Sequence, residues 1–191
     1  MFTRRRTAKA TAAVVIAIPL TLGGLTSQSQ AQDASPSPSG TFGPGCSSLS
    51  QKASTAKDKV VEAAAAYPQL SQLVAAVVRA ELGDTLDGRP AVTVFAPSQK
   101  AFQSVPASQL SSLLGNREQL KKVLTYHVVD KQITPEQLSK GSFTTLEGSK
   151  LTTSGSGTDF KVNDKAKIVC GNIKAANATI YVIDGVLQPP S

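Results

Sequence analysis

The hydrophobic positions of this chain change their spacing near its middle. Between residues 70 and 82 they recur at helical spacing, at Leu70, Leu73, Val74, Val77 and Leu82, which is the pattern of an amphipathic helix. Residues 57–66 are rich in alanine, and Pro68 then stands where a second helix could begin, ending near Gly83. The segment "RPAVTVFAP", residues 89–97, is instead a short apolar run, so we predict a buried strand there.

Two shorter helices are expected after this strand, over residues 108–114 and 118–123. The β-branched and aromatic side chains of "LTYHVV", residues 124–129, then predict extended backbone. In "TPEQL", Thr134 is suited to cap a brief helical turn that begins at Pro135.

Beyond residue 142 the chain consists of short strand-like segments separated by turn residues. These segments are "FTTLEG", "KLTTSGSG", "DFKVND", "AKIVCGN" and "ATIYVIDGVL". The stretch "SGSG", residues 154–157, is expected to connect two strands of a hairpin. Because helices dominate the first half and antiparallel strands the second, we predict an α+β fold.

The first 31 residues have the layout of a secretory signal peptide. Basic residues over 4–9 precede an apolar run over 12–25, and "SQA" offers a cleavage site after Ala31. The apolar run is shorter than the roughly 20 residues that span a bilayer, so we expect no stable membrane insertion after cleavage. "TRRRTAK" also partly resembles a twin-arginine signal, so general secretion and twin-arginine export both remain open.

Residues 32–45 are rich in Pro, Ser and Gly and are predicted to form a flexible linker without a core. One domain is expected to follow over residues 47–189, since about 160 residues after the signal are enough for a single core. We expect a monomer that is secreted or associated with the cell wall.

Charge argues against a nucleic-acid partner. The whole chain has 20 Lys and Arg against 13 Asp and Glu, a net charge of +7, and four of the cations leave with the signal. The remaining net charge of +3 is too small to suggest a surface with many phosphate contacts.

Candidate catalytic residues are scarce. His127 is the only histidine, no G-x-S-x-G segment supplies a nucleophile, and the His and Cys counts exclude a metal site built from them. "STAK", residues 54–57, matches S-x-x-K but lacks the companion motifs of penicillin-recognising enzymes. Asp184 is expected to accept backbone hydrogen bonds in the turn before Gly185, and Asn177 begins a glycosylation sequon that we expect to be unmodified. We therefore expect neither enzymatic activity nor a cofactor.

Two alternatives remain open. An exported hydrolase of cell-wall carbohydrate would need two carboxylates roughly 5–10 Å apart in a cleft. A carrier of lipid or another small ligand would need an apolar internal cavity of some hundreds of Å³.

The chain has two cysteines, Cys46 and Cys170. In an oxidising compartment a pair of this kind predicts one disulfide, although two buried or free thiols are the alternative. The bridge would close a long loop, so it would stabilise the domain by up to about 5 kcal/mol in a chain-entropy estimate.

Lys161, Lys165 and Lys167 occupy odd positions in "DFKVNDKAK" and would share one face with Asn163 if the segment were extended. One interpretation is a basic stripe that contacts an acidic polymer of the cell wall or matrix. The other is a solvated strand face that discourages edge pairing.

Three segments together resemble the fasciclin domain. They are "TVFAPSQKAF" (residues 93–102), the pair Tyr126–His127, and "ATIYVIDGVLQP" (residues 178–189), which resemble the first conserved motif, the Tyr-His pair and the second conserved motif. Their order fits a single copy. With the signal and the cysteine pair, the chain looks most like the small secreted fasciclin-domain antigens of mycobacteria and related actinobacteria.

This resemblance implies a β-wedge or sandwich of about seven strands flanked by several α-helices. It also implies a non-enzymatic module for cell adhesion or for binding a matrix protein or acidic polymer, with integrin not expected because the chain contains no RGD triplet. The implied structural or adhesive positions are Thr93, Phe95, Ala96, Pro97 and Phe102 in the first motif, Tyr126 and His127 in the pair, and Val182, Ile183, Asp184 and Val186 in the second motif.

Overall fold

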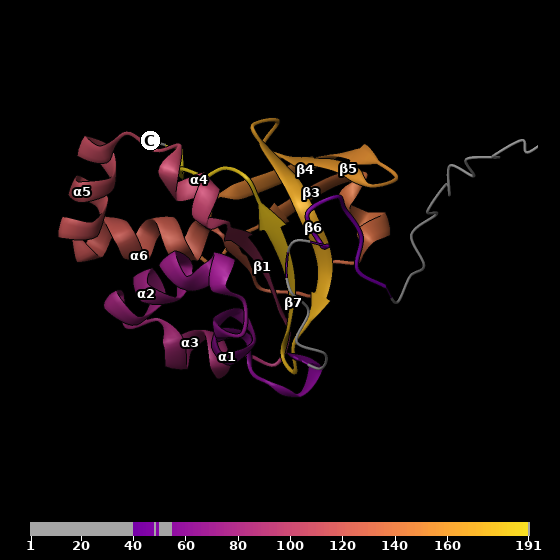
Figure 1. The fold of residues 1–191 in the computed structure, drawn as a ribbon, viewed down its shortest axis with the longest axis horizontal. Helices are drawn as coiled ribbons and strands as arrows, with labels where there is room; N and C mark the ends of the chain where they lie inside the picture. The colour runs from indigo at the N-terminus through magenta and orange to yellow at the C-terminus, as the bar shows by residue number, and fades with distance from the viewer. Residues whose placement is uncertain (1–39, 48, 50–54, 191) are drawn as a thin grey trace, which may run out of the picture. The chain divides into compact units, whose positions relative to one another are not determined.

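The computed structural model describes residues 40–47, 49 and 55–190. Within these residues the strands form one seven-stranded sheet (Figure 1). The expected signal peptide, residues 32–39 of the expected linker and the first residue of "STAK", Ser54, lie outside the described residues. The strand order is β2-β1-β7-β6-β5-β4-β3. The strands are β1 (Val92–Pro97), β2 (Val128–Val129), β3 (Lys140–Thr144), β4 (Lys150–Ser156), β5 (Asp159–Val162), β6 (Ala166–Lys174) and β7 (Ala178–Ile183). All neighbours are antiparallel except β1 and β7, which run parallel.

The six α-helices of the described residues gather on one side of β1 and β7, and β3, β4 and β5 lie on the other side (Figure 1). The helices are α1 (Val60–Ala65), α2 (Ser71–Arg79), α3 (Gly83–Asp87), α4 (Gln99–Gln103), α5 (Ala107–Gly115) and α6 (Arg117–Tyr126). Three short 3₁₀ segments are η1 (Thr55–Lys57), η2 (Pro68–Leu70) and η3 (Pro135–Leu138). The predicted α+β class with about seven strands is therefore confirmed.

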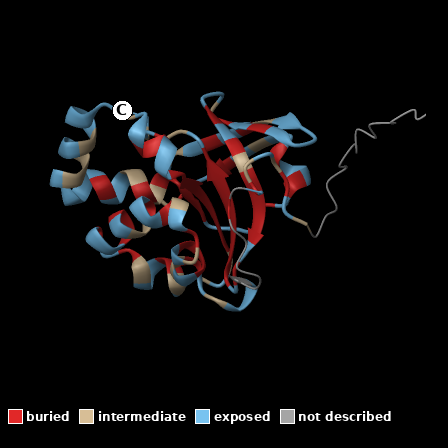
Figure 2. Ribbon diagram, viewed as in Figure 1, coloured by how far each residue is buried: buried red, intermediate tan, exposed pale blue. Residues whose placement is uncertain are grey.

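Strands β1 and β7 are buried on both faces, as Figure 2 shows. Alternate residues of β1 enter different hydrophobic clusters: Val92 and Val94 pack towards the helices, whereas Phe95 packs with residues of β4–β6. In β7, Ile180 and Tyr181 divide in the same way. A strand that is covered on both sides reads as a continuous apolar run rather than as an alternation, which is the pattern seen in the sequence.

The second predicted helix is shorter than expected. It ends at Arg79, because Glu81 adopts a left-handed conformation with φ of 56°. The Glu81 and Leu82 amides donate to carbonyls of the last helical turn, at Val78 and Val77, and so close the helix end. Gly83 begins α3 instead of ending α2. The prediction used glycine as the stop signal, but here a glutamate occupies the left-handed position.

The segment "LTYHVV" is only partly extended. Helix α6 continues through Tyr126, and strand β2 contains just two residues. Leu120 and Leu124 are four residues apart and both are buried in the cluster beneath the helices. This packing outweighs the β-propensity of the side chains that follow, since propensity is a weak preference that tertiary contacts override.

The turn predicted over residues 154–157 is displaced towards the C-terminus. Strand β4 runs to Ser156, which pairs with Asp159, so residues 157 and 158 make the connection. Gly157 has a φ of 61° and suits the turn. Gly155 lies within the strand with a φ of 134°, and a Cβ there would overlap the carbonyl group of Asp159.

The predicted linker over residues 32–45 is wrong for residues 40–45, which belong to the domain. The Phe42 backbone forms an antiparallel bridge with Gly171 of β6, through N–O distances of 3.2 and 2.7 Å. The Phe42 ring is 5% exposed and packs against the rings of Phe160 and Tyr181. Gly171 leaves the space that this ring fills, because a Cβ there would overlap it. A large aromatic residue inside a Pro/Ser/Gly-rich stretch was the signal for an ordered segment.

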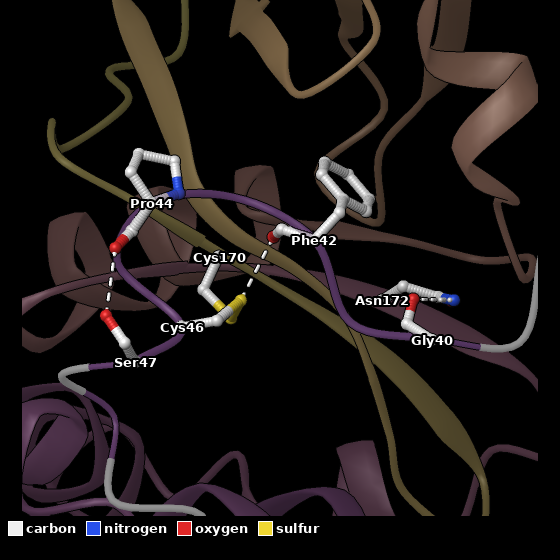
Figure 3. Close-up of a disulfide and its surroundings, with 7 residues drawn as sticks. All are labelled: Gly40, Phe42, Pro44, Cys46, Ser47, Cys170 and Asn172. Carbon is white, nitrogen blue, oxygen red and sulfur yellow. Dashed lines mark hydrogen bonds between the residues drawn. A yellow bond between two sulfur atoms is a disulfide. The ribbon is translucent and has the colours of Figure 1, made fainter. Parts of the chain in front are cut away.

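A disulfide joins this N-terminal segment to the sheet (Figure 3). Cys46 is bonded to Cys170 of β6, 124 positions later in the chain. On one side of the bridge, the Gly45 amide donates to the Val169 carbonyl. On the other side, the Asn172 side chain donates to the carbonyl oxygen of Gly40 at 3.0 Å, as Figure 3 shows. Residues 40–46 thus cover the part of β6 that extends beyond β5.

Candidate functional site

The first motif segment forms a corner between a strand and a helix. Strand β1 ends at Pro97, and the Ser98 hydroxyl then accepts a hydrogen bond from the Ala101 amide, which caps α4. The Ser98 amide donates to Ile183 at the end of β7, at 2.9 Å. Phe102 turns back into the core. Ala96 and Pro97 are also buried, so this corner joins the two motif strands and presents no reactive group.

Thr93 holds the loop that follows β2. Its hydroxyl donates to the Lys131 carbonyl at 2.7 Å and accepts from the Ile133 amide at 2.8 Å. The Tyr181 hydroxyl donates to the Ile133 carbonyl at 2.8 Å, and burial raises the pKa of this phenol so that it remains a donor. Both motif strands therefore bind the same loop through buried hydroxyl groups.

Tyr126 connects α6 to the opposite half of the sheet. Its hydroxyl donates to the Lys150 carbonyl at 3.1 Å and accepts from the Asn163 side-chain amide at 2.8 Å. Asn163 also accepts from the Thr152 amide through its side-chain oxygen. These bonds fix the turn between β5 and β6 against the end of α6.

His127 is 1% exposed, and both of its ring nitrogens are bonded. Nδ1 lies 2.7 Å from the Val123 carbonyl oxygen, and Nε2 lies 3.0 Å from the Leu187 amide. An amide donor at Nε2 requires a lone pair there, so the proton is on Nδ1, which donates to Val123. Burial lowers the pKa of His127 to about 4. The ring is therefore neutral at pH 7 and links α6 to the C-terminal segment.

The second motif is equally structural. Val182 and Ile183 are fully buried in β7, one in each hydrophobic cluster. The Asp184 carboxylate accepts from the Lys167 amide at 2.7 Å, and the Asp184 amide donates to the Lys167 carbonyl at 3.0 Å. Asp184 thus accepts a backbone hydrogen bond as expected. The donor, however, is on β6 and not in the turn before Gly185.

Asn177 has a larger role than its sequon suggested. Its side-chain oxygen accepts from the Val60 amide at 3.0 Å, and its side-chain nitrogen donates to the carbonyls of Leu86 and Arg89. The residue is buried and joins the start of α1 to the end of α3 and to the loop before β1. The sequence signal for this structural role was the position of Asn177 just before a buried strand.

Thr93→Val is expected to lower the free energy of unfolding by about 2 kcal/mol, because the buried Ile133 amide would lose its acceptor. Thr153→Val is the matched control: Thr153 is 4% exposed, and its hydroxyl has no hydrogen-bond partner among the described residues. That variant is expected to be neutral or slightly stabilising. Urea unfolding of both variants measures the difference, and equal losses would contradict the role given to the Thr93 hydroxyl.

The hollows of the described surface include three with volumes of about 400 to 500 Å³. A groove of about 480 Å³ between α5, α6 and the C-terminal segment is lined mainly by apolar and amide side chains, among them Leu113, Val123 and Val186. A polar hollow of about 400 Å³ beside α4 contains one carboxylate, Asp184. A third, of about 500 Å³, also contains one, Asp130. None of the three has the carboxylate pair of a glycoside hydrolase.

The internal apolar cavity is too small for a carried ligand. It lies between α1, α2 and β1, and its volume of about 20 Å³ is close to that of one water molecule. Within residues 40–47, 49 and 55–190, no three His, Cys, Asp or Glu side chains are placed to share a metal ion. No helix in the same part of the chain has the length and apolar character that crossing a membrane requires.

The lysine stripe has a different geometry from the one expected. Residues 159–167 are not one extended segment, since Asn163 and Asp164 have φ values of 51° and 54° and form a turn. Lys161 and Lys167 lie directly opposite each other on β5 and β6, and Lys165 is in the turn. The premise of a single strand face shared by all three lysines is wrong, because the local pattern does not reveal the hairpin between them.

The fold is an α+β domain in which both motif strands lie side by side and are held by buried hydrogen bonds. Residues 68–189 match the fasciclin domain, and the chain belongs to this family. It is 39% identical over 162 residues to the immunogenic protein MPB70 of Mycobacterium bovis, covering 78% of this chain and 82% of that protein. It is 41% identical over 144 residues to protein sll1483 of Synechocystis, covering 74% and 79% respectively.

Two further comparisons extend this relationship. The cell surface glycolipoprotein MPB83 of Mycobacterium bovis is 41% identical over 144 residues, which is 73% of this chain and 64% of that protein. Among solved structures, a FAS1 domain pair from the insect cell adhesion molecule Fasciclin I matches with a TM-score of 0.53 at 17% identity. The match covers 64% of this chain and 46% of the insect chain, so it shows a shared fold for about half of that structure.

Proposed function

We propose that this protein is an exported, non-enzymatic surface module that binds an extracellular or cell-wall macromolecule. Membership of the fasciclin family supports this function, as do relatives described as a cell surface glycolipoprotein and an immunogenic protein. One solved structure with this fold comes from an insect cell adhesion molecule. The expected signal peptide supplies the route to the outside.

The state of His127 is the observation that carries the proposal. Acid–base or nucleophilic catalysis most often relies on a histidine with a free nitrogen and a pKa near the working pH. Here both nitrogens are bonded to backbone groups, the ring is buried, and the pKa is lowered to about 4. The motif residues are thus used for folding, which leaves the exposed surface for function.

Retention of the purified protein on cell-wall fractions and immobilised matrix proteins tests the proposal. We expect saturable retention that excess unlabelled protein displaces. A reduced and alkylated sample is the control, since loss of binding with the disulfide would show that the folded surface is required. Retention no greater than that of an unrelated protein of equal net charge, on every fraction, would overturn the proposal.

Hydrolysis of wall carbohydrate is the alternative to exclude. The protein is expected to release no reducing ends from purified wall polysaccharide. Turnover that disappears in Asp184→Asn would assign a catalytic role to the single carboxylate of the hollow beside α4 and would refute the non-enzymatic assignment.

A further inference from the structure

A row of polar side chains crosses the exposed face of β3, β4, β5 and β6. The strand registers pair Lys140 with Ser154, Ser154 with Lys161, and Lys161 with Lys167. Directly opposed residues of antiparallel strands project from the same face, so these four side chains lie in one line perpendicular to the strands. The three lysines are exposed and the serine is partly exposed. Lys140 lies 21 residues before Lys161 in the sequence, so only the register brings these two lysines into one row.

The row is long enough to hold several units of a polymer. Neighbouring strands lie about 4.8 Å apart, so three intervals give roughly 14 Å from the β3 lysine to the β6 lysine. A second line of hydroxyl side chains runs beside it, since Ser142 of β3 is paired with Thr152 of β4. Both are exposed. The surface around the lysines is therefore polar and rich in hydroxyl groups.

The lysines of the row are not explained by folding. Lys161 and Lys167 face each other as like charges, an arrangement that destabilises a strand pair. Within the described part of the chain, none of the three lysines of the row forms an ion pair. The positive charge is thus available to a partner.

Acidic side chains near the row reduce this charge without cancelling it. Two nearby carboxylates accept hydrogen bonds from the row itself: Asp164 from the Ser154 hydroxyl and Asp184 from the Lys167 amide. Asp159 is a third, on β5. Lys150 of β4 and Lys165 of the turn add to the cations, and Glu147, which accepts from the Ser149 amide beside Lys150, adds a carboxylate. The count is then five lysines against four carboxylates.

We propose that this row binds a linear acidic polysaccharide laid across the four strands, with lysines meeting carboxylates and the hydroxyl side chains meeting sugar hydroxyls. The inference rests on the proposed surface-binding function and names the partner class. The cations named on this face are all lysines, which lack the two-pronged geometry with which arginine fixes an individual carboxylate or phosphate. A lysine is a point charge that accepts carboxylates in many orientations, which suits a repeating polymer.

The test uses polygalacturonate oligomers, neutral dextran oligomers and inorganic polyphosphate as probes, with affinities measured by calorimetry at 20 mM and 300 mM salt. The wild-type protein is expected to bind polygalacturonate at low salt and to lose most of this affinity at high salt. It should not bind dextran at either salt concentration. Lys161→Gln/Lys167→Gln should bind polygalacturonate about tenfold more weakly. Amide shifts on binding should map to β3–β6.

Lys100→Gln/Lys121→Gln is the matched control, since it removes the same charge from exposed positions on α4 and α6. It should bind as the wild type does. Equal weakening of polygalacturonate binding in both variants would show that only the net charge of the protein matters. Binding of polyphosphate but not of polygalacturonate would identify a phosphate polymer as the ligand. Either result overturns the inference. If the Lys161/Lys167 variant still binds cell-wall fractions fully, the inference fails and the proposed surface function stands.

Discussion

Reduction of the Cys46–Cys170 bridge is expected to lower the free energy of unfolding by about 4 kcal/mol. The bridge joins residues 124 positions apart, and in the chain-entropy account a crosslink of that length removes much of the freedom of the unfolded chain. For a domain with an ordinary stability of roughly 5–15 kcal/mol, this is a large share. Urea unfolding of the oxidised and the reduced protein measures the loss without changing the sequence.

The reduced protein should also open locally before it unfolds globally. Residues 40–46 are held on β6 by the bridge, by the Phe42–Gly171 backbone pair and by the Phe42 ring. Without the bridge, the Gly171 amide should exchange with solvent faster, because its acceptor belongs to a segment that can detach. Amides in the middle of β7 should follow the global stability only.

Cys46→Ala/Cys170→Ala provides the control, because its stability should not respond to reductant. Two thiols that react in the untreated native protein would contradict the bridge itself. An unfolding midpoint that does not move when the wild type is reduced would contradict its contribution to stability.

The sequence predicted best where one local pattern determined the outcome. The apolar run of β1 and the proline that ends it identified a buried strand, and the serine that follows it caps a helix in the structure. The helices α5 and α6 also begin within one residue of their expected starts. The errors occurred where contacts between distant residues determine the local structure. Helix α6 continues through Tyr126 because its side chains pack in the core. Residues 40–45 belong to the domain because Phe42 pairs with Gly171 on an open edge of β6.

The candidate surface depended on register, which a single sequence does not reveal. Two lysines of the row, Lys161 and Lys167, were identified, but they were grouped with Lys165, which is in the turn. Lys140 was missed because β3 lies two strands away from β5. For the motif residues, the sequence revealed the family but not the contacts. Their types and order identified the family, yet the bonds of Thr93, His127 and Asp184 run to backbone groups far away in the sequence or on other elements.

Lowering the pH from 7 to 5 is expected to destabilise the protein by about 2 kcal/mol through His127 alone. Its pKa is about 4 in the folded protein and 6.5 when exposed. The unfolded chain therefore binds a proton below pH 6.5 that the folded protein does not, and stability falls until about pH 4, for a total of roughly 3 kcal/mol. Glu136 and Glu147 also have lowered pKa values, but their stabilisation is lost only below pH 4.5.

Between pH 7 and 5 the loss of stability should therefore come from His127. The variant His127→Gln separates this contribution from that of the other titrating groups. A glutamine oxygen can occupy the position of Nε2 and accept from the Leu187 amide, but it does not titrate. The variant should be less stable at pH 7, because it loses ring packing and the bond to Val123, yet its stability should barely change down to pH 5. NMR titration of the wild-type imidazole gives a second reading that needs no variant. A ring that protonates near pH 6.5 in the folded protein would contradict its buried, doubly bonded state, because a proton on Nε2 would face the Leu187 amide with no acceptor between them.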